Sequence, residues 1–177
     1  LSGPSTVDLA VAHVACLRLG LVVVPTNGSY REAELAHVIA DCTPRAALVG
    51  HDGWAELLAG LDPDLVVAQL VDPFPDVPAD DGTAALLDVS LPGDPAIIGY
   101  TSGTTGRPKG AVLTHRNIVA AILQAETWFA PALERMPDLR KVNSIAALPL
   151  YHIFALTLCF LAMRQGSHLT LVPNPRD

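Results

Sequence analysis

The sequence has little charge and no concentrated basic segment. Asp, Glu, Lys and Arg make up 16% of its 177 residues, and the formal net charge is -7. Proteins whose main partner is a nucleic acid usually carry a cluster of Lys and Arg, so we expect no nucleic-acid partner. Half of the residues are hydrophobic, which argues against intrinsic disorder and allows a buried core. The length suits one domain or part of a larger one.

Cysteines are also few. Cys16, Cys42 and Cys159 are odd in number and widely spaced, without a Cys-x-x-Cys pair or a Cys/His metal pattern. We therefore expect buried, reduced thiols in a cytoplasmic protein rather than disulfides or a zinc site. No secretory signal pattern is recognisable in the first residues, which agrees with that location.

Long apolar runs are missing too. The longest uncharged stretch, residues 144–163, is interrupted by Pro149, Tyr151 and His152. A membrane-spanning helix needs about 20 continuous apolar residues, so we expect a buried helix here and no transmembrane segment. A peripheral contact with a membrane stays open.

What the sequence does contain is an alternation of helical and strand patterns. Helices are predicted for residues 6–19, 31–42, 53–60, 115–129 and 150–164, and strands for residues 21–25, 45–50, 65–71, 96–101, 111–114, 144–148 and 168–172. In the first helix the apolar positions at helical spacing are Val7, Val11, Val14 and Leu17. Such alternation predicts an α/β layered fold with a largely parallel sheet.

Residues 72–95 differ in character from the rest. They contain five prolines among scattered aspartates, which predicts a loop rather than a regular element. Because the alternation of strands and helices resumes after them, we interpret them as a loop within one domain and not as a boundary between two.

The most distinctive segment is Tyr-Thr-Ser-Gly-Thr-Thr-Gly-Arg-Pro-Lys-Gly at residues 100–110. Its glycines let the backbone approach a ligand closely, and its hydroxyls and successive N–H groups are donors for an anion. Lys109 adds a single positive charge suited to phosphate oxygens. The candidate phosphate contacts are Thr101, Ser102, Gly103, Thr104, Thr105, Gly106 and Lys109.

This segment is not a Walker A loop. Counted from Gly103, the position that must be glycine in that motif is Pro108. The fold of the P-loop kinases and GTPases is therefore not implied. A Gly/Ser/Thr hairpin loop without a ligand is the alternative, and the density of donors around one lysine speaks against it.

Residues 100–110, with Ala-Val-Leu-Thr-His-Arg-Asn following at residues 111–117, resemble the signature of the adenylate-forming superfamily. That superfamily includes acyl-CoA synthetases, aryl-CoA ligases, luciferase-type enzymes and the adenylation domains of peptide synthetases. Residues 147–157, Ala-Leu-Pro-Leu-Tyr-His-Ile-Phe-Ala-Leu-Thr, resemble its next core motif. One departure is Asn27-Gly28, where many members have Asn-Pro.

The resemblance implies that residues 1–177 are part of the large N-terminal domain of such an enzyme. It implies activation of a carboxylic acid with ATP to an acyl-adenylate, followed by transfer to coenzyme A. Lys109 would be the catalytic cation on the phosphates, Thr101 would also meet Mg²⁺, and His152 would form a wall of the acid pocket. A general-base role for His152 is not needed, because a carboxylate is already ionised at neutral pH.

The segment at residues 148–157 most resembles bacterial long-chain fatty acyl-CoA synthetases, which makes a fatty acid the leading substrate. The apolar residues 145–161 would then line a tunnel, and the alternative is that they only pack in the core. The first half of the chain resembles malonyl-CoA synthetases about equally well.

Later motifs of the superfamily are absent: the magnesium glutamate motif, the ribose-binding Thr-Gly-Asp segment, and the C-terminal domain with its lysine. We therefore expect an N-terminal fragment that is inactive by itself. Two alternatives stay open: an adenylation domain or acyl-AMP ligase serving a carrier protein, and a non-catalytic nucleotide-binding module.

Overall fold

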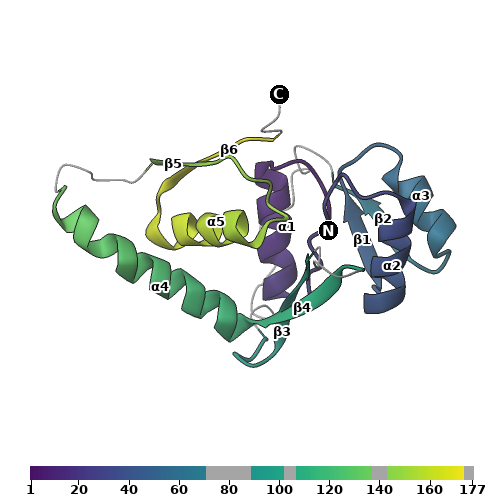
Figure 1. The fold of residues 1–177 in the computed structure, drawn as a ribbon, viewed down its shortest axis with the longest axis horizontal. Helices are drawn as coiled ribbons and strands as arrows, with labels where there is room; N and C mark the ends of the chain where they lie inside the picture. Colours follow the sequence, from purple (N-terminus) through teal and green to yellow (C-terminus); the bar gives the residue numbers. More distant parts are fainter. Residues whose placement is uncertain (71–88, 102–106, 137–142, 174–177) are drawn as a thin grey trace, which may run out of the picture.

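The computed structural model describes residues 1–70, 89–101, 107–136 and 143–173. Its elements are α1 (Val7–Arg18), α2 (Glu32–Cys42), β1 (Ala46–Val49), α3 (Trp54–Leu61), β2 (Val66–Gln69), β3 (Pro95–Thr101), β4 (Lys109–Thr114), α4 (His115–Glu134), β5 (Asn143–Ala146), α5 (Ile153–Gln165) and β6 (His168–Leu171). In these ranges the strands form three pairs, shown in Figure 1. Two pairs are parallel and the β3–β4 pair is antiparallel. The predicted α/β class with mostly parallel pairing is confirmed.

The first parallel unit consists of β1, α3 and β2, with α2 beside it at the right of Figure 1. Its core contains Leu35, Val49, Trp54, Leu58 and Leu65. The amphipathic pattern of α2 predicted this burial correctly, because Leu35 and Val38 are its buried residues.

The second parallel unit consists of β5, α5 and β6. α4 lies alongside α5, and α1 runs between this unit and the first one in Figure 1. Leu9 and Ala10 of α1 pack with Leu150, Ala155 and Cys159, so α1 is joined to the α5 unit by an apolar core. The buried helix expected at residues 150–164 is therefore confirmed, and in the described ranges no helix combines the length and apolar content needed to cross a membrane.

The helix predicted at residues 6–19 is confirmed as α1. Its apolar spacing does not mark the packed face, because Val7 and Val11 are 68% and 47% exposed, whereas Ala12 and His13 are buried. Both sides of this helix carry apolar residues, so helical spacing alone does not distinguish them.

The strand predicted at residues 21–25 is also wrong. Only Val23 forms a bridge, in parallel with Ile97 of β3, and Leu21 and Val22 are 52% and 42% exposed. Pro25 has no N–H to donate, so a ladder cannot continue through it. The apolar run thus supplies one buried anchor, Val23, rather than a strand.

α4 extends beyond its predicted end at residue 129. It continues through Pro131 to Glu134. A proline this close to the end of a helix removes only one N–H from the hydrogen-bond ladder. The predicted end of the helix at residue 129 is therefore too early.

Candidate functional site

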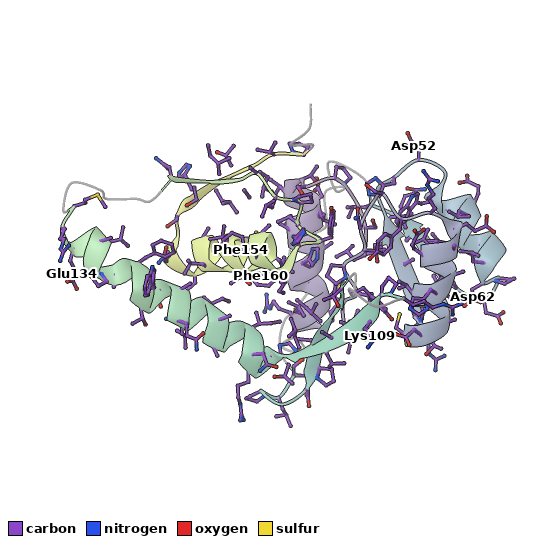
Figure 2. All side chains as sticks on the ribbon, in the orientation of Figure 1. Asp52, Asp62, Lys109, Glu134, Phe154 and Phe160 are labelled. Atoms are coloured by element: carbon purple, nitrogen blue, oxygen red, sulfur yellow. The ribbon has the colours of Figure 1, made fainter. Side chains whose placement is uncertain are left out.

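Thr101 and Lys109 lie directly opposite each other at the end of the β3–β4 hairpin. Thr101 is the last residue of β3, Lys109 is the first of β4, and the strand register pairs them. Directly opposed residues of an antiparallel pair project their side chains from the same face. Both residues are exposed, and Figure 2 shows Lys109 at the end of β4 that lies beside α2. An ammonium and a hydroxyl are thus presented to solvent together.

The five candidate residues between them, Ser102, Gly103, Thr104, Thr105 and Gly106, lie outside the described residues. The site is therefore described from its two ends. Because Thr101 and Lys109 are held as strand partners, these ends have a fixed separation set by the antiparallel ladder.

Gly110 of β4 lets side chains of β3 pack closely across the hairpin. It is opposite Tyr100, and a Cβ built on it would stand 2.7 Å from Cγ2 of Ile98 and 3.3 Å from Cζ of Tyr100. No larger residue fits there without moving both side chains. Glycine at this position therefore serves the packing of β3 side chains across β4, in addition to any role with a ligand.

Two side chains of α2 hold the same end of the hairpin. Nε2 of His37 donates to the carbonyl oxygen of Pro108 at 2.8 Å. The hydroxyl of Tyr100 donates to Oδ2 of Asp41 at 2.6 Å. The rings of His37 and Tyr100 also meet edge to face, with centroids 6.3 Å apart. We call these two hydrogen bonds the α2 clasp.

Burial, and next the hydrogen bond to Asp41, raise the pKa of Tyr100 above its ordinary value. The phenol therefore keeps its proton and is a hydrogen-bond donor at neutral pH. The sequence did not reveal the clasp, because its partners are 59 and 71 residues apart. The one available signal was that His37 and Asp41 are polar residues four positions apart on a helix.

His152 is exposed and stands at the N-terminal cap of α5. Its backbone N–H donates to the carbonyl of Pro149 at 2.9 Å, and its ring lies 5.6 Å from that of Tyr151. Within the described residues no hydrogen bond, ion pair or ring contact joins it to Thr101 or Lys109. The structure therefore pairs Thr101 with Lys109, and in the described ranges no direct bond or ring contact connects His152 to either.

The departure at Gly28 has a structural explanation outside the site. A Cβ on Gly28 would lie 2.6 Å from Cε1 of His51, so the absence of a side chain makes room for this ring. His51 also packs on Trp54, with ring centroids 5.2 Å apart, and burial lowers its pKa. The turn at residues 27–28 is therefore adapted to the His51 ring, which precedes α3.

All three cysteines are free. Cys159 is buried, Cys16 and Cys42 are half-buried, and burial raises the pKa of each thiol, so they are poor nucleophiles. Across the described ranges no group of three His, Cys, Asp or Glu side chains is arranged to hold a metal ion.

Comparison with known proteins shows the family to which this chain is similar. The model of the family described as AMP-binding enzyme matches residues 1–177, the whole sequence. The chain belongs to the AMP-binding enzyme family. The resemblance found in residues 100–117 and 147–157 is thereby confirmed at the level of the adenylate-forming superfamily.

Three relatives show the range of this similarity. A sulfoacetate–CoA ligase from Cupriavidus necator is 37% identical over 169 residues, covering 91% of this chain and 31% of that protein. A long-chain-fatty-acid–CoA ligase from Yersinia pestis is 49% identical over 85 residues, covering 48% of this chain and 14% of that protein. A solved malonyl-CoA ligase, in a ternary product complex with methylmalonyl-CoA and AMP, is 29% identical with a TM-score of 0.66, covering 98% of this chain and 34% of that one.

The chain thus spans no more than about a third of the length of these relatives. Their shared architecture confirms that it forms part of the domain of an adenylate-forming enzyme.

Proposed function

We propose that this chain is the part of an acid–thiol ligase that holds the phosphates of ATP during activation of a carboxylic acid. The observation that carries the proposal is the placement of Lys109 opposite Thr101, at the two ends of a loop rich in glycine and hydroxyl side chains. A cation and a hydroxyl on one face of a hairpin suit an anion bound between them. The family match and the product complex of the malonyl-CoA ligase support it.

In the first half-reaction, an oxygen of the carboxylate attacks the α-phosphorus of ATP. A new carboxylate–phosphorus bond forms, the bond from the α-phosphorus to the bridging oxygen breaks, and pyrophosphate leaves with the electron pair. Lys109 is the catalytic residue here, because its ammonium stabilises the charge that accumulates on the departing pyrophosphate. The exposed position of its side chain leaves it free to do so.

Thr101, Ser102, Thr104 and Thr105 would donate hydrogen bonds to phosphate oxygens, with Gly103 and Gly106 letting the backbone come close. Mg²⁺, when bound with ATP, supplies further positive charge at the phosphates, and the Thr101 hydroxyl is the residue of this chain that would contact it. A hydroxyl oxygen is a suitable ligand for this hard cation, and the exposure of Thr101 fits that role.

In the second half-reaction a thiol attacks the acyl carbon and AMP leaves. Coenzyme A is the proposed acceptor, since the relatives compared above are CoA ligases. A carrier-protein thiol is the alternative, and assays with each acceptor separate the two.

A fatty acid is the proposed substrate, with His152 at a wall of its pocket. The half-length similarity to a long-chain-fatty-acid–CoA ligase supports it. Apolar side chains next to His152 also support it, because Ile153 and Phe154 are 42% and 61% exposed and offer surface for an alkyl chain. The sulfoacetate–CoA ligase, which matches more of this chain, favours a short polar acid instead. Comparing the two acids in one assay decides between them.

The role of Lys109 is tested in the complete gene product that contains this sequence. Replacing Lys109 with Ala should lower the rate of pyrophosphate exchange into ATP by about 100-fold, as expected when a charge that stabilises a transition state is lost. Arg116→Ala is the matched control: Arg116 is an exposed cation at the start of α4, beyond the other end of β4, and its loss should leave the exchange unchanged. Equal rates in the Lys109→Ala and unaltered proteins would contradict the assigned role.

A further inference from the structure

The α2 clasp grips both strands of the hairpin where they meet the candidate loop. His37 and Asp41 are four residues apart, so they lie on the same face of α2, one turn from each other. His37 binds the carbonyl of Pro108, next to Lys109, and Asp41 binds the hydroxyl of Tyr100, next to Thr101. One helix face is therefore connected to the residue beside each of the two site residues.

These contacts are not a by-product of tight packing between α2 and β3. Val38 and Ile39 of α2 and Ile98 of β3 line a cavity of about 520 Å³. Apolar contact between the two elements is therefore incomplete, and the two directional hydrogen bonds of the clasp connect α2 to the hairpin beside these lining residues in sequence.

Strand geometry transmits this restraint to the site. Tyr100 is paired with Gly110, and Thr101 with Lys109, in consecutive steps of the same ladder. The ring of Tyr100 crosses over Gly110, as the short distance to a Cβ at this position shows. Any rotation of the hairpin end away from α2 would therefore move Thr101 and Lys109 together.

We propose that His37 and Asp41 are positioning residues, which hold Thr101 and Lys109 in the orientation that binds the phosphates of ATP. This inference rests on the proposed function and adds to it two residues that do not touch the substrate. The short bond between the Tyr100 phenol and the Asp41 carboxylate, 2.6 Å, has the length of a strong, charge-assisted hydrogen bond. Hydrogen bonds to a charged group contribute more than bonds between neutral groups.

The test uses the complete gene product and pyrophosphate exchange at varied ATP and varied acid. Tyr100→Phe, Asp41→Ala and His37→Ala should each lower kcat/KM for ATP by about tenfold, the effect expected for one hydrogen bond to a charged or carbonyl group. The KM for the acid should stay within about twofold, because the clasp acts on the phosphate side of the reaction. A residue needed only for folding would not separate the two substrates in this way.

Conservative variants keep the test valid if an alanine variant folds poorly. His37→Gln retains an N–H donor and should recover most of the lost kcat/KM. Asp41→Asn retains an oxygen acceptor without the charge, so it should recover part of the loss. The double variant Tyr100→Phe with Asp41→Ala should be no worse than either single variant, because both remove the same bond. Glu126→Ala is the control, since it breaks an exposed ion pair with Arg164, 2.9 Å long, between α4 and α5 and away from the hairpin. It should leave both constants unchanged.

Either of two outcomes would overturn this proposal while leaving the proposed function intact. The first is an active protein in which Tyr100→Phe and His37→Ala leave kcat/KM for ATP unchanged. The second is a rise in the KM for the acid as large as the loss of kcat/KM for ATP. If the unaltered protein catalysed no acid-dependent exchange, the proposed function would fail first and the clasp would lose its role with it. The two failures are therefore distinguishable.

Discussion

At the scale of single residues, Lys109 and Thr101 are an exposed cation and an exposed hydroxyl on opposite strands of one hairpin. They could be selected as candidates from residue types alone, because phosphate is bound by cations and short hydrogen-bond donors. Their opposition across an antiparallel ladder could not, since it depends on the register of β3 and β4. His37 and Asp41 were missed for a similar reason: hydrogen bonds across 59 to 71 residues leave no local pattern in a sequence.

No sequence pattern points to His13, the second residue of note. It is 1% exposed, its Nδ1 donates to the carbonyl of Leu9 at 2.8 Å, and its Nε2 is buried without a partner. Burial is the main cause that lowers its pKa from 6.5 to about 4. Folding therefore requires the neutral imidazole in the interior.

His13 should make the stability of the fold sensitive to acid. Between pH 6.5 and 4 the unfolded chain binds a proton that the folded chain does not, so the free energy of unfolding falls as the pH falls through this window. The loss approaches about 3 kcal/mol from this group. Urea unfolding at several pH values should show a clearly shallower decline for His13→Leu, and an unchanged decline for the exposed His168→Leu. Parallel declines for the His13→Leu and unaltered proteins would refute the assignment.

At the scale of elements, the sequence was reliable where one face of an element differs clearly from the other. α2 is the example, with Leu35 and Val38 buried as its pattern indicated. α1 is the opposite case, because both of its sides are apolar. Its packed side is the one that contacts residues of α5. The run at residues 21–25 was apolar enough for a strand, and Pro25 prevented the ladder that the pattern suggested.

The junction between β4 and α4 depends on a cap that is visible in the sequence. The N–H of Asn117 donates to Oγ1 of Thr114 at 3.3 Å, and the N–H of Thr114 donates to Oδ1 of Asn117 at 2.9 Å. This reciprocal pair satisfies two N–H groups where the strand turns into the helix. It also fixes the far end of the hairpin that carries Lys109.

Thr114→Ala should lower the free energy of unfolding by about 1 kcal/mol, the usual effect of losing an N-terminal cap. Thr114→Ser keeps the hydroxyl and should lose much less. Thr127→Ala serves as control, because its hydroxyl bonds the carbonyl of Leu123 in mid-helix and caps nothing. Urea midpoints measure all three. If Thr114→Ala and Thr127→Ala had equal midpoints, the cap would not stabilise this junction.

At the scale of the whole molecule, the chain is organised as two parallel units with an antiparallel hairpin and α1 beside them (Figure 1). The chain contains the candidate phosphate contacts and spans about a third of the relatives' length.

The proposed acid pocket has less support in the sequence than the candidate phosphate contacts. His152 was selected from a resemblance rather than from its chemistry, and it stands at the N-terminal cap of α5. A pocket for an acid depends on side chains brought together in three dimensions, and an apolar segment has the same sequence pattern whether it packs in the core or binds a ligand. The candidate phosphate contacts depend less on the fold, because their donors lie in one short run of sequence.

The measurement that tests the central claim most directly is exchange of labelled pyrophosphate into ATP, catalysed by the complete gene product without any thiol. Activation of a carboxylic acid through an acyl-adenylate predicts exchange that requires the acid and needs no coenzyme A, because the first half-reaction is reversible by itself. A long-chain fatty acid, sulfoacetate and malonate are the acids to compare. Exchange with at least one of them would support the account. Binding of ATP without acid-dependent exchange for any carboxylic acid would contradict it, and would favour a nucleotide-binding module that performs no ligation.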